Sequence, residues 1–418
     1  MAYNMNKENS GGRGGIHYAW IICLVCALMQ FCSIGLLMNT FQVFHPGLMA
    51  AFDLSNTELS LLIELRSIFN VASLFLVVKY YRRVGYKLGF LMALLLAASA
   101  MLVLYFARNY IMLCLAYSMM GSAYALSSAV PASSMVALWF EERRGFALGM
   151  MSAGSGVASV VMSPLFSRLL ENHSLGFCFM LQAAIFVSAG ILASVLLDTP
   201  ENKKLCPYGM KKEGGGERLV RKDGTELPKR LMHKVMAAAF LMGAFQSVAY
   251  AYFMSLHTEE GIARDNVALG LSLFGLALIA GKFSFGYLSD RLGTSRANTL
   301  VYFCVFIGLV MSYFVHQNLA LLYISMLLFG FGSCMGNVGL PVWASDFSRA
   351  AFYPETYNLI QKSFMIGNLV FNPAVGPAAD LLGTYRPIYL TFAALSLVSY
   401  ILIQSVYSNV HKGNKQPL

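Results

Sequence analysis

Two lysines lie inside apolar stretches, where a positive charge needs a chemical explanation. Lys282 belongs to an apolar run that begins at Leu269 and ends in a charged turn containing Asp290. Lys362 lies eight residues after Pro354 in another such stretch. At about 1.5 Å of rise per residue, each lysine is roughly 12 Å from one end of its helix. A cation that deep in a hydrocarbon core about 30 Å thick costs several kcal/mol unless it meets an anion or water. The two lysines therefore indicate an anion-binding site, although each could instead reach an interface or pair with a buried acid.

The composition places these lysines in a membrane. Of 418 residues, 57% are hydrophobic and 12% are charged, whereas soluble domains carry about 25% charged residues. The net charge of +10 could suggest nucleic acid as a partner. Its basic residues fall in short loops between apolar segments rather than on one soluble face, so we exclude nucleic acid. No early hydrophobic stretch ends in a cleavage signal, and we expect the first span to be retained.

Twelve apolar segments have the length of membrane spans, which predicts an all-α membrane protein with twelve transmembrane helices. In chain order, spans 1 to 12 are expected at residues 18–43, 57–79, 88–107, 110–138, 146–166, 177–197, 233–256, 267–288, 297–315, 319–341, 354–377 and 387–407. They divide into a first six-helix bundle (16–198) and a second one (233–407), joined by a basic linker (199–232). Residues 1–15 are polar and glycine-rich, so we expect disorder there, and 408–418 form a tail.

The loops on the two sides of the membrane differ in charge. The cationic side carries Lys79, Arg82, Arg83 and Lys87 after span 2, Arg143 and Arg144 after span 4, Arg291 and Arg296 after span 8, and nine basic residues in the linker. The other side carries Asp53, Glu58, Glu171, Glu259, Glu260 and Asp265. The positive-inside rule therefore predicts that both termini and the linker are cytoplasmic, in a plasma or inner membrane.

The two six-span halves share landmarks at nearly one offset. The pairs are Gly85 and Gly293, Gly121 and Gly330, and Pro131 and Pro341, about 208, 209 and 210 residues apart. Several landmarks at one offset favour a duplicated unit, which is the architecture of transporters built from repeats around a site at the middle of the membrane.

The charged turn after span 8 resembles a known family motif. Gly286-Tyr-Leu-Ser-Asp-Arg-Leu-Gly293 is similar to the loop between spans 8 and 9 of the major facilitator superfamily, a resemblance that extends over essentially the whole chain. It implies two pseudo-symmetric six-helix bundles and gating roles for Gly286, Asp290, Arg291 and Gly293. In that family the aspartate contacts a neighbouring helix start and latches the cytoplasmic side, as the helix dipole favours. The equivalent turn after span 2 has Arg82 where the family has aspartate.

A second stretch narrows the resemblance. Trp139-Phe-Glu-Glu-Arg143-Arg144-Gly-Phe-Ala-Leu-Gly149, followed by two further glycines, is similar to the span 4–5 signature of monocarboxylate and oxalate/formate-type transporters. In the oxalate/formate branch, one cation in span 8 and a lysine in span 11 match Lys282 and Lys362. This resemblance implies a secondary carrier whose two midplane lysines bind the carboxylate of a small organic anion, with Arg143 and Arg144 in the gating loop.

The coupling mode has two readings. The proton-coupled monocarboxylate branch usually places an aspartate one turn before its span 8 cation, where this chain has Leu278. Two unpaired cations are also costly to occlude without substrate. Both points favour antiport, with proton-coupled monocarboxylate symport as the alternative.

Other polar residues in the spans could support either mode. Glu64 could bind a proton or pair with a cation, and its spacing from Arg66 does not put the two on one face. Spans 1, 4, 7 and 10 line the cavity in the family that this chain resembles. Their polar residues could donate hydrogen bonds to a carboxylate or serve helix packing; these are Asn39, Tyr124, Tyr250 and Asn337.

The spans show neither a metal-ligand cluster nor a converging Ser/His/Asp group, so we do not expect an enzyme, a metal site or a cofactor. Cys23 and Cys26 lie inside an apolar helix and are read as packing residues. The expected partners are a small carboxylate substrate and the lipid bilayer, and we expect a monomer. The sequence does not indicate which acid is carried.

Overall fold

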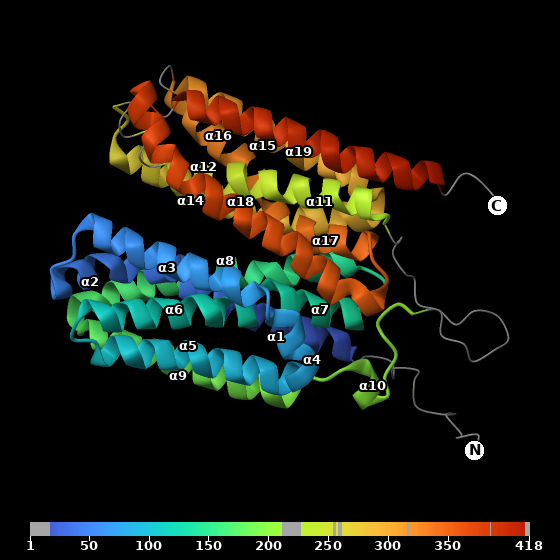
Figure 1. The fold of residues 1–418 in the computed structure, drawn as a ribbon, viewed down its shortest axis with the longest axis horizontal. Helices are drawn as coiled ribbons and strands as arrows, with labels where there is room; N and C mark the ends of the chain where they lie inside the picture. The colour runs from blue at the N-terminus through green and yellow to red at the C-terminus, as the bar shows by residue number, and fades with distance from the viewer. Residues whose placement is uncertain are drawn as a thin grey trace.

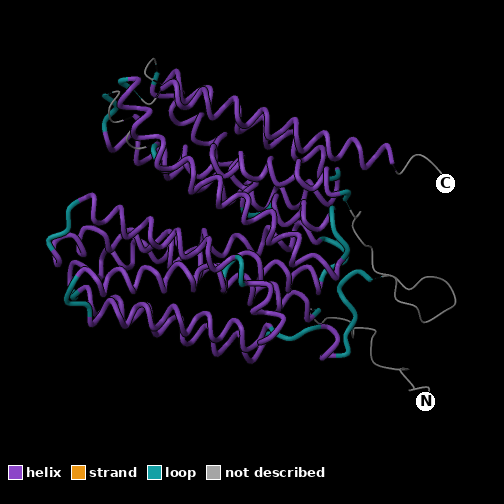
Figure 2. The backbone as a smooth tube through the Cα atoms, in the orientation of Figure 1, coloured by secondary structure: helices purple, strands orange, loops and turns teal. Residues whose placement is uncertain are grey.

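The computed structural model describes residues 17–210, 227–253, 256–257, 261–315, 318–384 and 386–413. The predicted disordered N-terminus, most of the basic residues of the linker, Glu259 and Glu260 lie outside these ranges. Helices make up nearly all of the described chain (Figure 2). The fold class predicted from the apolar segments is therefore confirmed.

The first half contains α1 (Tyr18–Gln30), the π-helix η1 (Phe31–Asn39), η2 (Thr40–Phe44), α2 (His45–Phe52), α3 (Asn56–Leu74), α4 (Val77–Val84), α5 (Tyr86–Phe106), α6 (Tyr110–Ser127), α7 (Ala129–Trp139), α8 (Arg144–Asn172) and α9 (Leu175–Leu196). The short α10 (Pro200–Lys203) follows. The second half contains α11 (Lys229–Met242), the π-helix η3 (Gly243–Ser247), α12 (Val248–Ala251), α14 (Arg264–Leu292), α15 (Thr294–Phe314), α16 (Leu319–Gly332), η5 (Ser333–Gly336), α17 (Gly339–Asp346), η6 (Ala350–Phe352), α18 (Tyr353–Leu382) and α19 (Arg386–Gly413).

All twelve predicted spans correspond to helices. In the described residues, ten helices are long and apolar enough to cross a membrane, and α3 with α4, bent by 57°, makes an eleventh. The twelfth, α18, has 30 residues but is not among those ten. Its first half carries Glu355, Asn358, Gln361 and Lys362. These polar residues face protein rather than lipid over much of their surface, so α18 needs less apolar character than a lipid-facing helix.

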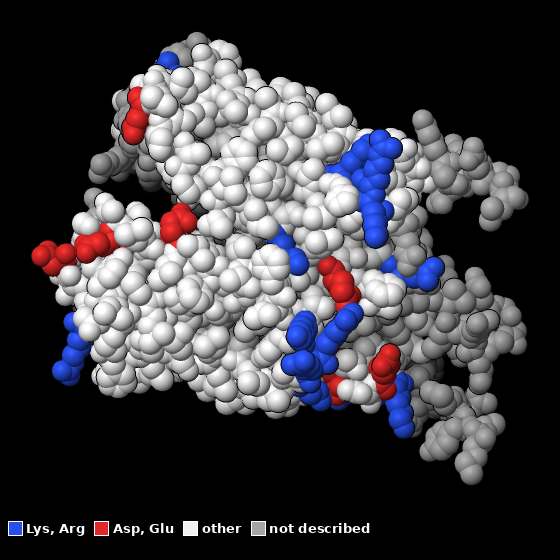
Figure 3. All heavy atoms as spheres, in the orientation of Figure 1, with Lys and Arg blue, Asp and Glu red and all other residues white. Residues whose placement is uncertain are grey.

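The helices form two bundles, α1 to α9 and α11 to α19, which lie side by side in Figure 1. The bundles meet mainly along two seams. One is α8 against α14, the other is α18 against α3, α4 and α7, and α17 also approaches α7 and α8. One end of the molecule holds the start of α1, the short α10, the start of α11 and the end of α19 (Figure 1). We call it the "linker end". On the face in Figure 3, an uncharged belt covers the middle and basic side chains gather toward the linker end.

The repeated glycines have the same local role in both halves. Gly85 (φ 77°) ends α4 and Gly293 (φ 85°) ends α14, and both have the positive φ that favours glycine. Each N–H bonds back to the carbonyl four residues earlier, Tyr81 at 2.9 Å and Ser289 at 3.2 Å. The next helix then begins at once, at Tyr86 and Thr294. These tight turns hold spans 2 and 3, and spans 8 and 9, as antiparallel pairs.

Spans 1, 4, 7 and 10 are each interrupted within the membrane. Span 1 contains η1, span 7 contains η3, span 10 contains η5, and span 4 breaks at Ser128, whose ψ is −137°. Backbone groups released inside a membrane need other partners. Side chains supply them: Gln182 Nε2 donates to Leu36 O at 3.1 Å, and Tyr81 Oη donates to Leu126 O at 2.6 Å.

Candidate functional site

Lys282 lies where α14 crosses α8 at backbone contact. A Cβ added to Gly149 would lie 2.4 Å from Lys282 O, and one added to Gly286 would lie 2.3 Å from Gly145 O. Only glycine permits this approach, which is the usual role of small residues between membrane helices. The crossing buries Lys282, whose residue surface is 2% exposed.

The ammonium group of Lys282 has neutral partners. Its Nζ donates to Ser152 O at 3.0 Å and to Ser155 Oγ at 2.9 Å, both on α8. None of the ion pairs within the described part of the chain includes Lys282. Ser152 Oγ in turn donates to Asn337 O at 3.0 Å, just after η5. A buried cation thus joins spans 5, 8 and 10, and no acidic side chain in the described ranges pairs with it.

Lys362 lies at the other seam. Its Nζ is 4.6 Å from the centroid of the Phe75 ring, at the break between α3 and α4. One helical turn earlier, Asn358 Nδ2 donates to Leu74 O at 2.9 Å across the same seam. Phe75 is 61% exposed and Lys362 is half-buried. The two lysines lie at similar depths along their helices. In the described structure, however, Lys282 contacts α8 and Lys362 contacts Phe75 between α3 and α4, and they share no partner.

Glu64 and Arg66 also face different elements. Glu64 Oε1 accepts a hydrogen bond from Asn372 Nδ2 at 2.9 Å, which links α3 to α18 across the two halves. Arg66 is 5% exposed, and its Nη1 donates to Leu37 O in η1 at 3.1 Å. Glu64 therefore lies at the boundary between the bundles, and Arg66 lies inside the first one.

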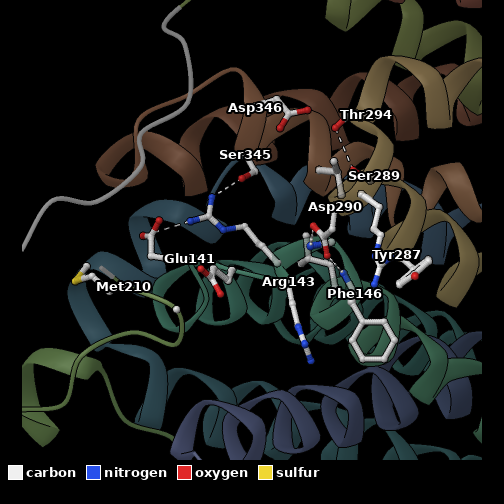
Figure 4. Close-up of a pocket in the computed structure, with 17 residues that line it drawn as sticks. Glu141, Arg143, Phe146, Met210, Tyr287, Ser289, Asp290, Thr294, Ser345 and Asp346 are labelled. Atoms are coloured by element: carbon white, nitrogen blue, oxygen red, sulfur yellow. Dashed lines mark hydrogen bonds and ion pairs between the residues drawn. The ribbon is translucent and has the colours of Figure 1, made fainter. Parts of the chain in front are cut away.

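Asp290 joins the halves at the linker end. Its Oδ1 accepts from Gly145 N and its Oδ2 accepts from Phe146 N, each at 2.9 Å, in the first turn of α8 (Figure 4). Both oxygens therefore receive N–H groups that the helix start leaves free, and the helix dipole adds to the attraction.

The arginines of the two loops lie around Asp290. Arg144 donates from Nη1 to Ser345 Oγ of α17 and from Nε to Phe140 O at 2.9 Å. Arg291 lies 5.0 Å from the ring centroid of Tyr287. Arg143, with φ 57°, turns the chain into α8. A cavity of about 1080 Å³ is lined by these arginines together with Glu141, Glu142, Ser345 and Asp346.

In the first repeat, the turn that corresponds to the Asp290 turn carries a basic residue instead of an acidic one. Arg82 corresponds to Asp290 at the 208-residue offset, and Glu355 corresponds to Gly145 at an offset of 210. The Arg82 guanidinium pairs with the Glu355 carboxylate, which lies in the first turn of α18. Both seams thus carry a carboxylate at the start of a helix. At the start of α8 this carboxylate is Asp290, which belongs to the other bundle. At the start of α18 it is Glu355, which belongs to α18 itself.

A family model of the Major Facilitator Superfamily matches residues 24–354. The chain belongs to this superfamily. Among its curated relatives, Monocarboxylate transporter 12-B of Danio rerio is 23% identical over 308 residues, 66% of this chain and 63% of the relative. The chain thus spans slightly less than two thirds of that relative. Riboflavin transporter MCH5 of Saccharomyces cerevisiae is 24% identical over 429 residues, 95% of this chain and 80% of the relative.

A solved structure has the same fold. The Major Facilitator Superfamily transporter FucP, in the outward conformation, superposes with a TM-score of 0.69 at 17% identity, over 93% of this chain and 99% of that one. The fold therefore agrees with membership of the superfamily.

The four uncharged residues that we predicted as hydrogen-bond donors to a carboxylate lie in different parts of the structure. Asn39 Nδ2 donates to Ser159 Oγ at 3.1 Å, on the same helix as the Lys282 partners. Tyr250 is 43% exposed, and its ring stacks on Phe274 at 4.6 Å. Tyr124 is buried in α6. Of the four, Asn337 is the one that contacts a partner of Lys282, and it does so through its backbone carbonyl.

Two residues of the candidate site were missed by the sequence analysis. Ser152 and Ser155 hold the Lys282 ammonium group. Their signal is modest, since two serines three residues apart in a glycine-rich helix usually mark close packing. In the residues described, no group of three His, Cys, Asp or Glu side chains could hold a metal ion.

Proposed function

We propose that this transporter carries small organic anions, mono- or dicarboxylates, by alternating access and exchange, with Lys282 binding the substrate carboxylate. The observation that carries the proposal is the Lys282 ammonium group, which is buried between the two halves and, among the described residues, has two serine oxygens as its hydrogen-bond partners. Burying a positive charge within the membrane costs free energy unless an anion binds beside it. The monocarboxylate transporters among the relatives support the same substrate class.

Exchange follows from the same charge. In a carrier without substrate, the halves must move past each other while the ammonium group stays out of water, which is unfavourable. A bound carboxylate neutralises it and lowers the barrier to this movement. Loaded carriers therefore reorient readily and empty carriers reorient poorly. Lys362 is the second cation of the proposal, and its contact with Phe75 offers partial compensation while no anion is bound.

The linker end supplies the gate of the proposed cycle. The contacts of Asp290 with the start of α8 and of Arg82 with Glu355 hold the halves together there. Release of substrate at that end requires both contacts to break. Gly286 lets α14 approach the start of α8 at backbone contact, and Gly293 ends α14 at a positive φ. Arg143, Arg144 and Arg291 surround the same gate. We place this end in the cytoplasm, with both termini, in a plasma or inner membrane, and we propose that the monomer suffices for transport.

Reconstitution into liposomes tests the function. Uptake of labelled formate, acetate, lactate, pyruvate, oxalate and succinate is measured with and without unlabelled acid inside. The proposal expects at least one of these acids to enter much faster when internal substrate is present. Equal uptake of an acid into empty and loaded vesicles would contradict exchange. If none of the acids enters through correctly folded protein, the anion assignment is wrong.

A second candidate, proton-coupled symport of a monocarboxylate, is favoured by Glu64. Its carboxylate bonds to the neutral side chain of Asn372 across the two halves, so protonation would change a contact between them. Under this candidate, a proton gradient drives uptake into empty liposomes, and Glu64→Gln abolishes the pH dependence. A Glu64→Gln variant with wild-type pH dependence would exclude Glu64 as the coupling acid.

A further inference from the structure

The start of the linker is folded onto the loop between spans 4 and 5, and the transport proposal assigns it no role. The structure describes this stretch as far as Met210. We call residues 205–210 the strap. Trp139 holds the chain twice, because its Nε1 donates to Asp198 O at 2.7 Å and its carbonyl oxygen accepts from Tyr208 N at 2.8 Å. The path from α9 to the strap is therefore fixed at both ends.

Tyr208 of the strap bonds to the loop that leads into α8. Its carbonyl oxygen accepts from Glu141 N at 2.9 Å and from Glu142 N at 3.3 Å. Tyr208 thereby forms a parallel β-bridge with Phe140. Directly after this bridge, the chain turns at Arg143, with φ 57°, and enters α8. The strap therefore fixes the backbone immediately before the turn into α8.

Gly209 lets the strap lie this close to the loop. Its φ is 81°, in the region that favours glycine. An added Cβ would lie 2.4 Å from Glu142 Cβ and 2.9 Å from Glu142 N. Gly209 and Met210 line the linker-end cavity together with Asp290 and Ser345 of the second bundle (Figure 4). The strap thus ends at the boundary between the bundles, although its hydrogen bonds given above join it to the first one.

The ring of Tyr208 provides a second connection to the start of α8. It lies 5.6 Å from the Trp20 ring and 5.7 Å from the Phe140 ring, centroid to centroid. Such separations are typical of favourable aromatic pairs. The Trp20 ring lies in turn 6.2 Å from that of Phe146, whose N–H is one of the two donors to Asp290. The backbone and the ring of Tyr208 therefore both lead to the donors of the gate contact.

The gate contact depends on how the chain enters α8. The N–H groups of Gly145 and Phe146 have no partner within the helix, and both must point at the Asp290 carboxylate to bind it. The entry is held on one side by the strap and on the other by Arg144, whose Nε donates to Phe140 O at 2.9 Å. Without the strap, one of these two supports is lost. The donors then leave Asp290 more often, which is a local opening of the structure.

We propose that the strap is a positioning element that keeps the start of α8 directed at Asp290 and so sets how often the gate contact opens. A change that lifts the strap from the loop weakens the gate without altering either partner of that contact. The inference rests on the gate of the proposed function, but it does not depend on which substrate is carried.

Amide hydrogen exchange of the purified full-length protein in detergent tests the strap. The rate is measured on peptides that cover Gly145 and Phe146, whose amides bond to Asp290 and not to the strap. Their exchange therefore reports the opening of the gate contact. Gly209→Ala forces the strap away from Glu142, and we expect these amides to exchange at least several-fold faster. Tyr208→Ala removes the ring contacts without adding a clash, and it should raise the rate as well.

The matched control is Gly261→Ala. Gly261 has φ 82°, and an added Cβ meets nothing within 4 Å. The residue precedes α14, at the opposite end of that helix from Asp290. This variant therefore carries the same backbone strain as Gly209→Ala without a clash, and exchange at the start of α8 should stay at the wild-type rate.

Asp290→Ala removes the gate contact and gives the upper limit of the exchange rate. If the strap acts through that contact, adding Gly209→Ala to Asp290→Ala produces no further rise. A strap that merely stabilised α8 would raise the rate again in the double variant, and this result would overturn the inference.

Two further results would also overturn it, and they separate the strap from the gate. If Asp290→Ala speeds exchange but neither strap variant does, the gate stands and the strap has no positioning role. If Asp290→Ala leaves the rate at the start of α8 unchanged, the contact does not hold the bundles together. The strap inference and the gate of the proposed function then fail together, while liposome uptake still decides the anion assignment.

Discussion

Lys282 of α14 donates a hydrogen bond to Ser155 Oγ of α8 at 2.9 Å, across the boundary between the two bundles. The contact places a charged side chain of one half on a helix of the other half. Any movement that separates α8 from α14 must break it. An anion that binds the same ammonium group competes directly with this contact. Under the proposed function, substrate binding and movement of the halves would therefore be coupled at this one atom.

Ser155→Ala should increase the apparent affinity for the substrate. The empty carrier loses one acceptor of the Lys282 ammonium group, while a loaded carrier has the substrate carboxylate in its place. A hydrogen bond to a charged group contributes about 1.5–3 kcal/mol, so the half-saturation concentration in exchange should fall roughly tenfold or more. Ser159→Ala, one turn further along α8, serves as the control because Ser159 bonds to Asn39 instead. A rise in half-saturation for Ser155→Ala would show that Ser155 contacts the bound state.

Gly149→Ala should destabilise the protein and slow exchange. The new Cβ would lie 2.4 Å from the backbone oxygen of Lys282, which cannot move without shifting α14. Overpacking of this kind costs about 1–3 kcal/mol, and a lower unfolding temperature in detergent would register it.

Gly275→Ala is the matched control for that substitution, since a Cβ there meets nothing within 4 Å. Alanine is favoured over glycine inside a helix by about 0.5–1 kcal/mol, so this variant should be as stable as the wild type or slightly more stable. Equal unfolding temperatures for the two variants would mean that the α8–α14 crossing is not tight.

Charge reversal should show that Arg82 and Glu355 act as a pair. Arg82→Glu places two carboxylates together at the start of α18, whereas Arg82→Glu with Glu355→Arg restores opposite charges. Partly exposed pairs contribute about 0.2–1 kcal/mol, so the single change should alter the exchange rate up to about fivefold.

The double variant should recover the wild-type exchange rate, and high salt should reduce the difference between all the variants. If the two changes simply add, without recovery, the residues act independently and the pair is not a latch.

The membrane fold was predictable from the sequence because its signals are local. Runs of apolar residues indicate the spans, and glycines after the charged turns mark positions that the structure shows at positive φ. The depth of a lysine in the membrane follows from its distance in sequence from the end of its span, without any knowledge of packing. α18 was found in the sequence although its polar first half removes it from the strongly apolar helices.

The direction of each side chain was not predictable in the same way. Lys282 and Lys362 have similar depths, but the rotation of each helix decides whether the ammonium group meets α8 or the ring of Phe75. Arg82 and Glu355 are 273 residues apart, and only the docking of the two bundles brings them together. The π-helices in spans 1 and 7 likewise leave no clear trace in an apolar sequence.

Exchange by the Lys282→Ala transporter is the most direct test of the proposed role of this lysine. Lys234→Ala is the control, because Lys234 is another lysine of a spanning helix that bonds to a serine, Ser405, at 3.3 Å. Removing one partner of a buried charge pair costs about 2–5 kcal/mol. We therefore expect Lys282→Ala to lower carboxylate exchange at least roughly thirtyfold in liposomes, with Lys234→Ala close to the wild type. Exchange at the wild-type rate by correctly folded Lys282→Ala would contradict the proposal that this lysine binds the substrate.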